Sequence, residues 1–516
     1  MSDTPRPPPG PAGKFDVVVI GSGPAGHKAT IQAAKAGKRV VLVEREIDVG
    51  GACVHRGTIP SKTLRETALA FTAFRLKTGG VFPVTMREDL EVASLMNRME
   101  DVIRAHERFM SEQLRRNGAL KLHGRARFVD ARTVEVETVG GGRQHLAGDF
   151  IVIATGSRPR TPPDVPVDHD KILDSDSLLS MTWLPKSLTV LGAGVIASEY
   201  ATIFAALGVK VTMVDKGPRP LGFLDSEVVD QFVAAFTRAG GRYVGGRKHA
   251  KVEWDGVEHV VTTLDDGSEI RSERLLCCLG RVANVDGLEL AAAGLAVNDR
   301  GVIPVDEHCR TSVPHIYAVG DVIGPPSLAS SSMEQGRGAV CHALDLVLGH
   351  GSETIPAGIY TIPEMSQVGL TEAEATKKYG GCLVGRAKFE ELARGQISAI
   401  QDGLLKLVAD PGGKHVLGIQ IVGEGACELI HVGQMALLND FGVDGFVDNI
   451  FNFPTLAEAY RVAALDIVKQ RAKLFLNGIA PSPATAPVVD PCASPGSTAA
   501  SAPVMTPGSD SGRGGG

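Results

Sequence analysis

The stretch FDVVVIGSGPAGHKATIQAAKAGKRVVLVE, residues 15–44, indicates the fold most clearly. An apolar strand leads into a glycine-rich turn, a helix follows, and a second apolar strand ends at Glu44. Gly21, Gly23 and Gly26 have the spacing G-x-G-x-x-G, in which the first allows a tight turn, the second admits a pyrophosphate, and the third allows close helix–strand packing. The stretch therefore predicts a βαβ unit with a dinucleotide phosphate at its helix N-terminus and the adenosine ribose near Glu44.

A second stretch, SLTVLGAGVIASEYATIFAALGVKVTMVD (187–215), repeats this layout. Gly192 and Gly194 take the first two glycine positions, and Ala197 takes the third. Because alanine is small, the helix can still pack closely on the strand. The chain therefore has two predicted dinucleotide sites.

The residues after the second stretch bear on cofactor choice. Asp215 ends the strand, where a carboxylate binds a free ribose 2′-hydroxyl and favours NAD(H). Lys216 and Arg219 follow, and their cations either pair with the 2′-phosphate of NADP(H) or serve as ordinary surface charges. The residues alone leave both NAD(H) and NADP(H) open.

Two further segments are typical of a flavin site. IVIATGSRP (151–159) predicts a strand ending at Thr155 and Gly156, where small residues let the chain pass close to a dinucleotide. HIYAVGDV (315–322) predicts a strand that presents Asp321 at its carboxyl end, where open α/β sheets bind ligands. Asp321 is placed to accept hydrogen bonds from ribityl hydroxyls.

The pattern changes after about residue 350. Alternating strands (GIYTIP, LLKLVAD, HVLGIQIVG) precede an apolar helical stretch near residues 425–440, which predicts an α+β domain for oligomerisation or substrate binding. The predicted fold is thus α/β, with two Rossmann-like three-layer domains and a C-terminal α+β domain. We expect a disordered tail (1–14), an FAD-binding domain (15–158 and 286–350), an NAD(P)-binding domain (159–285), the α+β domain (351–477) and a second disordered tail (478–516).

Composition sets further limits. With 516 residues, 43% of them hydrophobic, the chain can form several cores. The formal net charge of −6 is spread without a basic stripe, so neither nucleic acid nor an anionic membrane is an expected partner. No apolar run reaches about 18 residues and no secretory signal precedes the first strand, so we expect a cytoplasmic protein. The eight cysteines are scattered without a CxxC pair, so we expect no metal.

In combination these motifs resemble the FAD-dependent pyridine nucleotide-disulfide oxidoreductase family over about residues 15–475. The resemblance implies that the first unit binds FAD, the second binds NAD(P)H, and the C-terminal domain forms a homodimer or part of a higher homo-oligomer. The matching segments are GSGPAG, GGACVHRGTIPSK, ATGSRP, GAGVIASEYA, LGRVAN, YAVGDV and FPTLAEAYR.

The chain departs from that family at its dithiol chemistry. Disulfide reductases have a C-x4-C pair, but here Cys53 is followed five positions later by Thr58, whose hydroxyl cannot form a disulfide. The histidine expected before Pro454 is Phe453, which cannot transfer a proton, and Glu458 is expected only to cap a helix or pair with Arg461. With the flavin and nicotinamide motifs retained, the chain is similar to the soluble, Si-specific pyridine nucleotide transhydrogenases.

The resemblance implies hydride transfer between NADPH and NAD⁺ through FAD. Lys62 is then the cation near flavin N5 and Glu199 its partner beside the nicotinamide, and Cys53 is an apolar neighbour of the flavin rather than a reactive thiolate. Two alternatives stay open: an NAD(P)H:quinone or oxygen oxidoreductase, and a redox-sensing flavoprotein controlled by nicotinamide binding. The remaining residues implied to contact cofactor are Arg45, Gly51, Thr58, Val195, Ile196 and Gly280.

Overall fold

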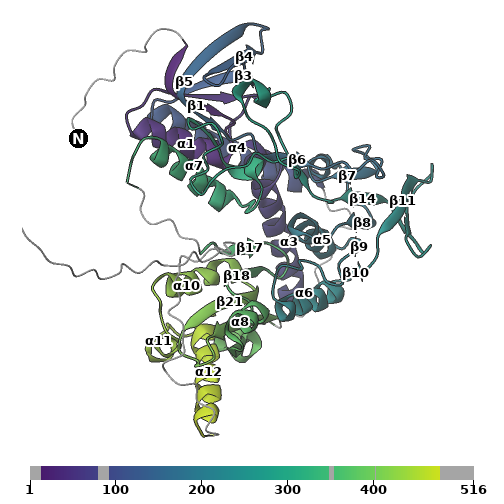
Figure 1. Ribbon diagram of the computed structural model, residues 1–516. Coiled ribbons are helices and arrows are strands. Elements are labelled where there is room, and N and C mark those ends of the chain that lie inside the picture. Colours follow the sequence, from purple (N-terminus) through teal and green to yellow (C-terminus); the bar gives the residue numbers. More distant parts are fainter. Residues whose placement is uncertain (1–12, 79–91, 348–353, 401, 477–516) are drawn as a thin grey trace, which may run out of the picture.

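The computed structural model describes residues 13–78, 92–347, 354–400 and 402–476 (Figure 1). Its sheets confirm the predicted α/β fold with a C-terminal α+β domain. The predicted N-terminal tail lies outside the described residues except for Gly13 and Lys14, where the first strand begins. The predicted C-terminal tail lies wholly outside them. In the part of the chain that is described, no helix is both long and apolar enough to cross a membrane.

The first domain is built on a parallel sheet in the order β3-β2-β1-β5-β16. Strand β4 pairs in antiparallel fashion with residues 124–128 of β3 and with residues 143–147 of β5. Val17 and Val19 of β1 pack on the helix side, while Val18 and Ile20 pack on the opposite side, so both faces are buried. The strands are β1 (Lys14–Ile20), β2 (Val40–Glu44), β3 (Leu120–Phe128), β4 (Thr133–Thr138), β5 (Arg143–Ile153) and β16 (Ile316–Ala318).

Helices α1 and α7 pack side by side against this sheet (Figure 1). Small side chains on α1, among them Ala25, Ala29 and Ala33, are fully buried and allow the close approach. The helices of this domain are α1 (Pro24–Lys35), α2 (Gly51–His55), α3 (Thr58–Thr78), α4 (Val92–Arg116), α7 (Ala329–Ala343) and the short 3-10 helices η2 (Leu290–Ala293) and η3 (Gly320–Ile323).

The second domain has a parallel sheet in the order β10-β9-β8-β14-β7, with helices α5 and α6 and a three-stranded antiparallel sheet, β11-β12-β13. A two-stranded ribbon of β6 and β15 connects it to the first domain. Its elements are β6 (Ser157–Pro159), β7 (Ile172–Asp174), η1 (Ser177–Ser180), β8 (Ser187–Leu191), α5 (Val195–Ala206), β9 (Lys210–Asp215), α6 (Ser226–Arg238), β10 (Arg242–Gly245), β11 (His249–Trp254), β12 (Val260–Leu264), β13 (Glu269–Ser272), β14 (Arg274–Cys277) and β15 (Arg281–Ala283).

The C-terminal domain is an antiparallel sheet, β17-β18-β21-β20-β19, with α10 and α12 packed on one face. Helix α6 of the second domain contacts β21. The elements are β17 (Ala357–Ile359), β18 (Met365–Gly369), α8 (Glu372–Tyr379), β19 (Leu383–Lys388), η4 (Phe389–Glu391), α9 (Ala393–Ile397), β20 (Gly403–Ala409), β21 (Val416–Gly423), α10 (Ala426–Leu438), α11 (Val443–Asp448) and α12 (Glu458–Leu476).

Candidate active site

The first glycine-rich turn has the geometry of a phosphate cradle. Gly21 has a φ of +100°, and a Cβ there would lie 2.4 Å from the carbonyl oxygen of Ala154. A Cβ on Gly26 would lie 1.8 Å from the carbonyl oxygen of Gly21. Gly23, the N-cap of α1, instead has nothing within 4 Å of the corresponding position. Gly21 and Gly26 thus close the turn. Gly23 leaves room for a phosphate at the positive end of the helix.

The second turn repeats this geometry. Gly192 has a φ of +101°, and a Cβ there would lie 2.5 Å from the carbonyl oxygen of Cys278. Gly194 is the N-cap of α5 and again has nothing within 4 Å. Ala197 takes the third position and is fully buried. The turn therefore also presents free backbone amides to a phosphate.

The acids that end β2 and β9 accept hydrogen bonds from nearby turns. Oε2 of Glu44 accepts hydrogen bonds from the backbone N–H of Ser22 at 2.8 Å and from its hydroxyl at 2.7 Å. Oδ1 of Asp215 accepts one from the backbone N–H of Gly217 at 2.7 Å. Glu44 thereby ties the end of β2 to the first glycine-rich turn, and Asp215 shapes the loop that follows β9. Both carboxylates lie at the carboxyl ends of their strands, where a dinucleotide ribose would lie.

A cavity of about 2230 Å³ extends from the first cradle to the second. Its volume is large enough for more than one drug-sized ligand, since the pocket for one such ligand usually measures about 300–1,000 Å³. The structure brings sixteen of the predicted site residues to its wall: Gly21, Gly23, Glu44, Arg45, Gly51, Cys53, Thr58, Lys62, Thr155, Gly156, Gly194, Val195, Ile196, Glu199, Gly280 and Asp321.

A smaller cavity of about 500 Å³ adjoins the second cradle at the end of β9. Gly194, Asp215, Lys216 and Arg219 line it. The guanidinium of Arg219 is paired with Asp230 of α6, with Nε 2.6 Å from Oδ1. The structure therefore brings together at this cavity the three residues of the second unit that were predicted to lie near the adenosine ribose, Asp215, Lys216 and Arg219. Gly26 and Gly192 line neither of these two cavities, because they close the turns behind them.

Three residues on the wall of the large cavity have buried polar atoms whose hydrogen-bonding capacity is unused. Within the described part of the chain, Thr155 Oγ1, Asp176 Oδ1 and the Tyr200 hydroxyl are buried without a hydrogen-bond partner, and all three residues line this cavity. Buried polar atoms in native proteins normally have partners. These atoms and the two open cradles therefore fit FAD on the first unit and a nicotinamide nucleotide on the second.

The flavin-side loops are fixed by hydrogen bonds. Asp321 lies in η3, and its Oδ2 accepts a hydrogen bond of 2.6 Å from the Ser157 hydroxyl. Nε of Arg281 donates to the same hydroxyl at 2.8 Å. Asn284 donates through its side chain to the carbonyl oxygen of Thr155 and through its backbone to that of Gly156, both at 2.9 Å. The strand ends after β5 and β16 are thus held together beside the cavity.

Lys62 and Glu199 form an ion pair between the two cradles. Lys62 Nζ lies 2.6 Å from Glu199 Oε2, and the Glu199 side chain is 6% exposed against 25% for Lys62. The other oxygen of Glu199 accepts the backbone N–H of Tyr360 at 3.0 Å. Lys62 Nζ also lies 4.8 Å above the Tyr360 ring. A partly exposed cation is therefore held in place on the cavity wall by Glu199 of α5 and by Tyr360, which follows β17.

Family models decide the class to which this architecture belongs. A model described as pyridine nucleotide-disulphide oxidoreductase matches residues 15–336, and one for the dimerisation domain of that family matches residues 355–464. The chain belongs to the pyridine nucleotide-disulphide oxidoreductase family. This confirms the family resemblance found in the sequence.

Relatives within this family are similar over nearly their whole length. The soluble pyridine nucleotide transhydrogenase of Mycobacterium bovis (strain BCG / Pasteur 1173P2) is 44% identical over 461 residues, which are 89% of this chain and 98% of the relative. That of Hahella chejuensis is 42% identical over 464 residues, 88% of this chain and 98% of the relative. The crystal structure of LpdA from Mycobacterium tuberculosis is 27% identical, with a TM-score of 0.81 over 87% of this chain and 99% of that one.

The chain departs from the disulphide chemistry in the family's name at Cys53. Cys53 lies in α2 as a free thiol. Burial raises the pKa of this thiol, although a hydrogen bond with the Thr58 side chain and the charge of Lys62 oppose the shift. The neighbour of Cys53 at the start of α3 is thus a hydroxyl, which cannot form a disulfide. The elevated pKa favours the protonated thiol, as expected for a packing role.

The segment before α12 departs from the family in the same way. Phe453 precedes Pro454 and is 69% exposed. Glu458 begins α12, and its Oε2 accepts a hydrogen bond of 3.3 Å from the backbone N–H of Thr455. Glu458 therefore holds the turn that leads into the helix.

Several cavity residues were not singled out from the sequence. Tyr360 follows β17 in the C-terminal domain and reaches the pair of Lys62 and Glu199. Tyr200 and Asp176 also line the cavity, and each has a buried oxygen without a hydrogen-bond partner among the described residues. Only the position of Tyr200, directly after Glu199 on the helix behind the second cradle, could have suggested a site residue from sequence.

Proposed function

We propose that this protein is a flavoprotein NAD(P)⁺ transhydrogenase, which moves hydride between NADPH and NAD⁺. The observation that carries the proposal is the single large cavity that joins two dinucleotide cradles, has the pair of Lys62 and Glu199 on its wall and places Thr58 instead of a second cysteine beside Cys53. Relatives more than 40% identical are named soluble pyridine nucleotide transhydrogenases.

The residues of the first unit hold FAD and those of the second unit hold the nicotinamide nucleotide. When bound, FAD supplies a group that accepts hydride from one nicotinamide and returns it to another. Lys62 places positive charge where reduction adds negative charge, and Glu199 fixes the direction of its ammonium group. Because the site offers no dithiol to accept electrons, the hydride that one nicotinamide nucleotide donates is accepted by another.

The smaller cavity accepts either nucleotide. Asp215 is placed to bind a free 2′-hydroxyl, whereas Lys216 and Arg219 supply cations for a 2′-phosphate. Both NAD(H) and NADP(H) are then substrates at one position in turn. We also propose that the protein acts in the cytoplasm as a homodimer formed through residues 355–464, the range that matches the dimerisation domain.

A direct test uses purified protein under anaerobic conditions. We expect the visible spectrum of oxidised flavin, and reduction of thio-NAD⁺ by NADPH at a rate well above that of a quinone or a disulfide substrate. A colourless protein would contradict the proposal. Faster reduction of the quinone would instead assign an NAD(P)H:quinone oxidoreductase, and nucleotide-dependent assembly with slow turnover would assign a sensor.

A further inference from the structure

The loop between β9 and α6, residues 216–225 and here called the cofactor loop, forms the wall of the smaller cavity. Its Leu221 N–H donates to the carbonyl oxygen of Ala193 in the second cradle at 2.9 Å. The Tyr243 hydroxyl donates to the carbonyl oxygen of Gly217 at 2.8 Å. The path of this loop therefore decides where Lys216 and Arg219 lie relative to the second cradle.

The C-terminal domain packs against the far end of the cofactor loop. Leu221 and Leu224 are buried in one apolar cluster with Ile359, Met365 and Leu404 of the C-terminal domain. Because side chains alternate along a strand, Leu404 and Lys406 of β20 face the second domain while Leu405 and Leu407 face α12. One polar residue, Lys406, is therefore presented to the end of the loop from within an apolar strand.

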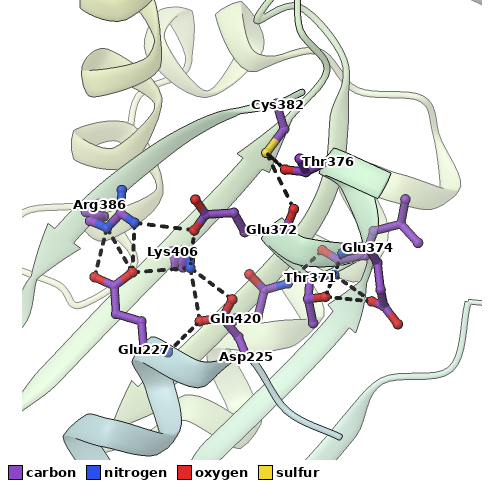
Figure 2. Close-up of polar contacts among 11 residues, drawn as sticks. Asp225, Glu227, Thr371, Glu372, Glu374, Thr376, Cys382, Arg386, Lys406 and Gln420 are labelled. Carbon is purple, nitrogen blue, oxygen red and sulfur yellow. Dashed lines mark hydrogen bonds and ion pairs between the residues drawn. The ribbon is translucent and has the colours of Figure 1, made fainter. Parts of the chain in front are cut away.

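The Lys406 side chain is 2% exposed and has carboxylate partners from both domains (Figure 2). Its Nζ lies 3.0 Å from Oδ1 and 2.9 Å from Oδ2 of Asp225, the last residue of the cofactor loop. It also lies 3.2 Å from Glu227 of α6 and 2.6 Å from Glu372 of α8. Asp225 in turn is the N-cap of α6, accepting the Glu227 N–H at 3.0 Å.

Arg386 of β19 completes the cluster through Glu227, with Nε 2.8 Å from Oε1. Three carboxylates thus face two cations, Lys406 and Arg386. Removing Lys406 therefore takes away the cation that pairs directly with buried Asp225 among the described residues. Burial by itself would lower the pKa of Lys406, but hydrogen bonds with Glu372 and Asp225 outweigh it and raise the pKa. Lys406 is therefore charged at neutral pH. Breaking a buried pair from one side is costly because the remaining charge stays desolvated.

We propose that Lys406 is a positioning residue for nicotinamide nucleotide binding, acting from the C-terminal domain through Asp225 on the cofactor loop. The inference rests on the proposed binding of NAD(P)(H) to the second unit. It makes the adenosine side of that site depend on a domain that contributes none of the residues lining the smaller cavity.

The test compares Lys406→Met with Asp225→Asn, because asparagine keeps the N-cap of α6 but loses the charge. We expect the Kd for NADP⁺, measured by titration of the flavin absorbance, to rise about tenfold in each variant, the scale of coupling between contacting residues. The rate of flavin reduction at saturating NADPH should stay within about twofold, and the flavin should remain bound. Lys406→Arg should restore part of the affinity.

Lys388→Met at the end of β19 is the matched control, since Lys388 is exposed and pairs only with Glu390 among the described residues. It should leave the Kd unchanged. If Asp225→Asn and Lys406→Met lower the melting temperature but not the affinity, the cluster is merely structural and the proposal is wrong. If Lys406→Met does not fold, an unchanged Kd in Asp225→Asn overturns it alone. A wild-type protein that binds no NADP⁺ would instead refute the proposed function.

Discussion

Lys62 and Glu199 are 137 residues apart in the chain, yet Lys62 Nζ lies 2.6 Å from Glu199 Oε2. Lys62 comes from α3 of the first domain, and Glu199 comes from α5 of the second. The packing of these two helices therefore places one charged pair at the boundary between the two nucleotide sites.

Replacing Lys62 by methionine should slow flavin reduction. The substitution keeps a side chain of similar length but removes the positive charge, and a charged group of this kind is worth about 10²-fold or more in rate. Stopped-flow reduction by NADPH, followed at the flavin absorbance, measures the effect. Lys35→Met, at an exposed position on α1, should retain the wild-type rate. An unchanged rate in Lys62→Met would remove the assigned role.

Gly26→Ala should abolish flavin binding. Its Cβ would lie 1.8 Å from the carbonyl oxygen of Gly21, so the first cradle has to open. The purified variant should show little absorbance near the flavin maximum, and added FAD should not restore it. Gly140→Ala is the control, because nothing lies within 4 Å of its Cβ position. Full flavin content in Gly26→Ala would show that the turn does not hold the cofactor.

Cys53 should react slowly with alkylating agents at neutral pH. Because burial raises its pKa above the ordinary value of 9.0, less of the thiol is deprotonated at any given pH. The alkylation rate of Cys53 by iodoacetamide, followed by mass spectrometry, should still be rising with pH above 9, whereas that of the urea-unfolded chain should be levelling off. Cys53→Ser should keep transhydrogenation within about twofold. Rapid alkylation at pH 7 would instead indicate a reactive thiolate.

Asp230 should weaken the binding of NADP(H) by competing for Arg219. The pair is bidentate, with contacts of 2.6 and 3.1 Å, and both side chains are more than half exposed. Asp230→Asn should therefore lower the KM for NADPH about two- to fivefold, as expected for an exposed ion pair, and leave that for NADH unchanged. Arg219→Gln should raise the KM for NADPH only. The control Glu112→Gln removes the carboxylate that pairs with Arg115 and Arg116 on α4, outside both cavities. Equal changes for both nucleotides would rule out a contact with the 2′-phosphate.

The glycine-rich turns were predictable because their cause is local. Gly21 and Gly192 have a positive φ, and there is no space for a Cβ at Gly26. Residue type and spacing therefore predict the turns without knowledge of any tertiary contact. The same holds for β1 and β2, whose apolar runs match a sheet buried on both faces. The absence of a second cysteine at Thr58 is likewise a property of the sequence alone.

The approach of residues from different domains was not predictable in this way. Nothing near Tyr360 in the sequence indicates that its backbone N–H binds Glu199, and LLKLVAD does not indicate that Lys406 reaches Asp225. The sequence determined the two nucleotide units, their phosphate turns and the missing dithiol, since these depend on residues close together in the chain. Only the tertiary structure decided which charges meet across the domain boundaries, because their distances depend on how separately formed sheets and helices pack.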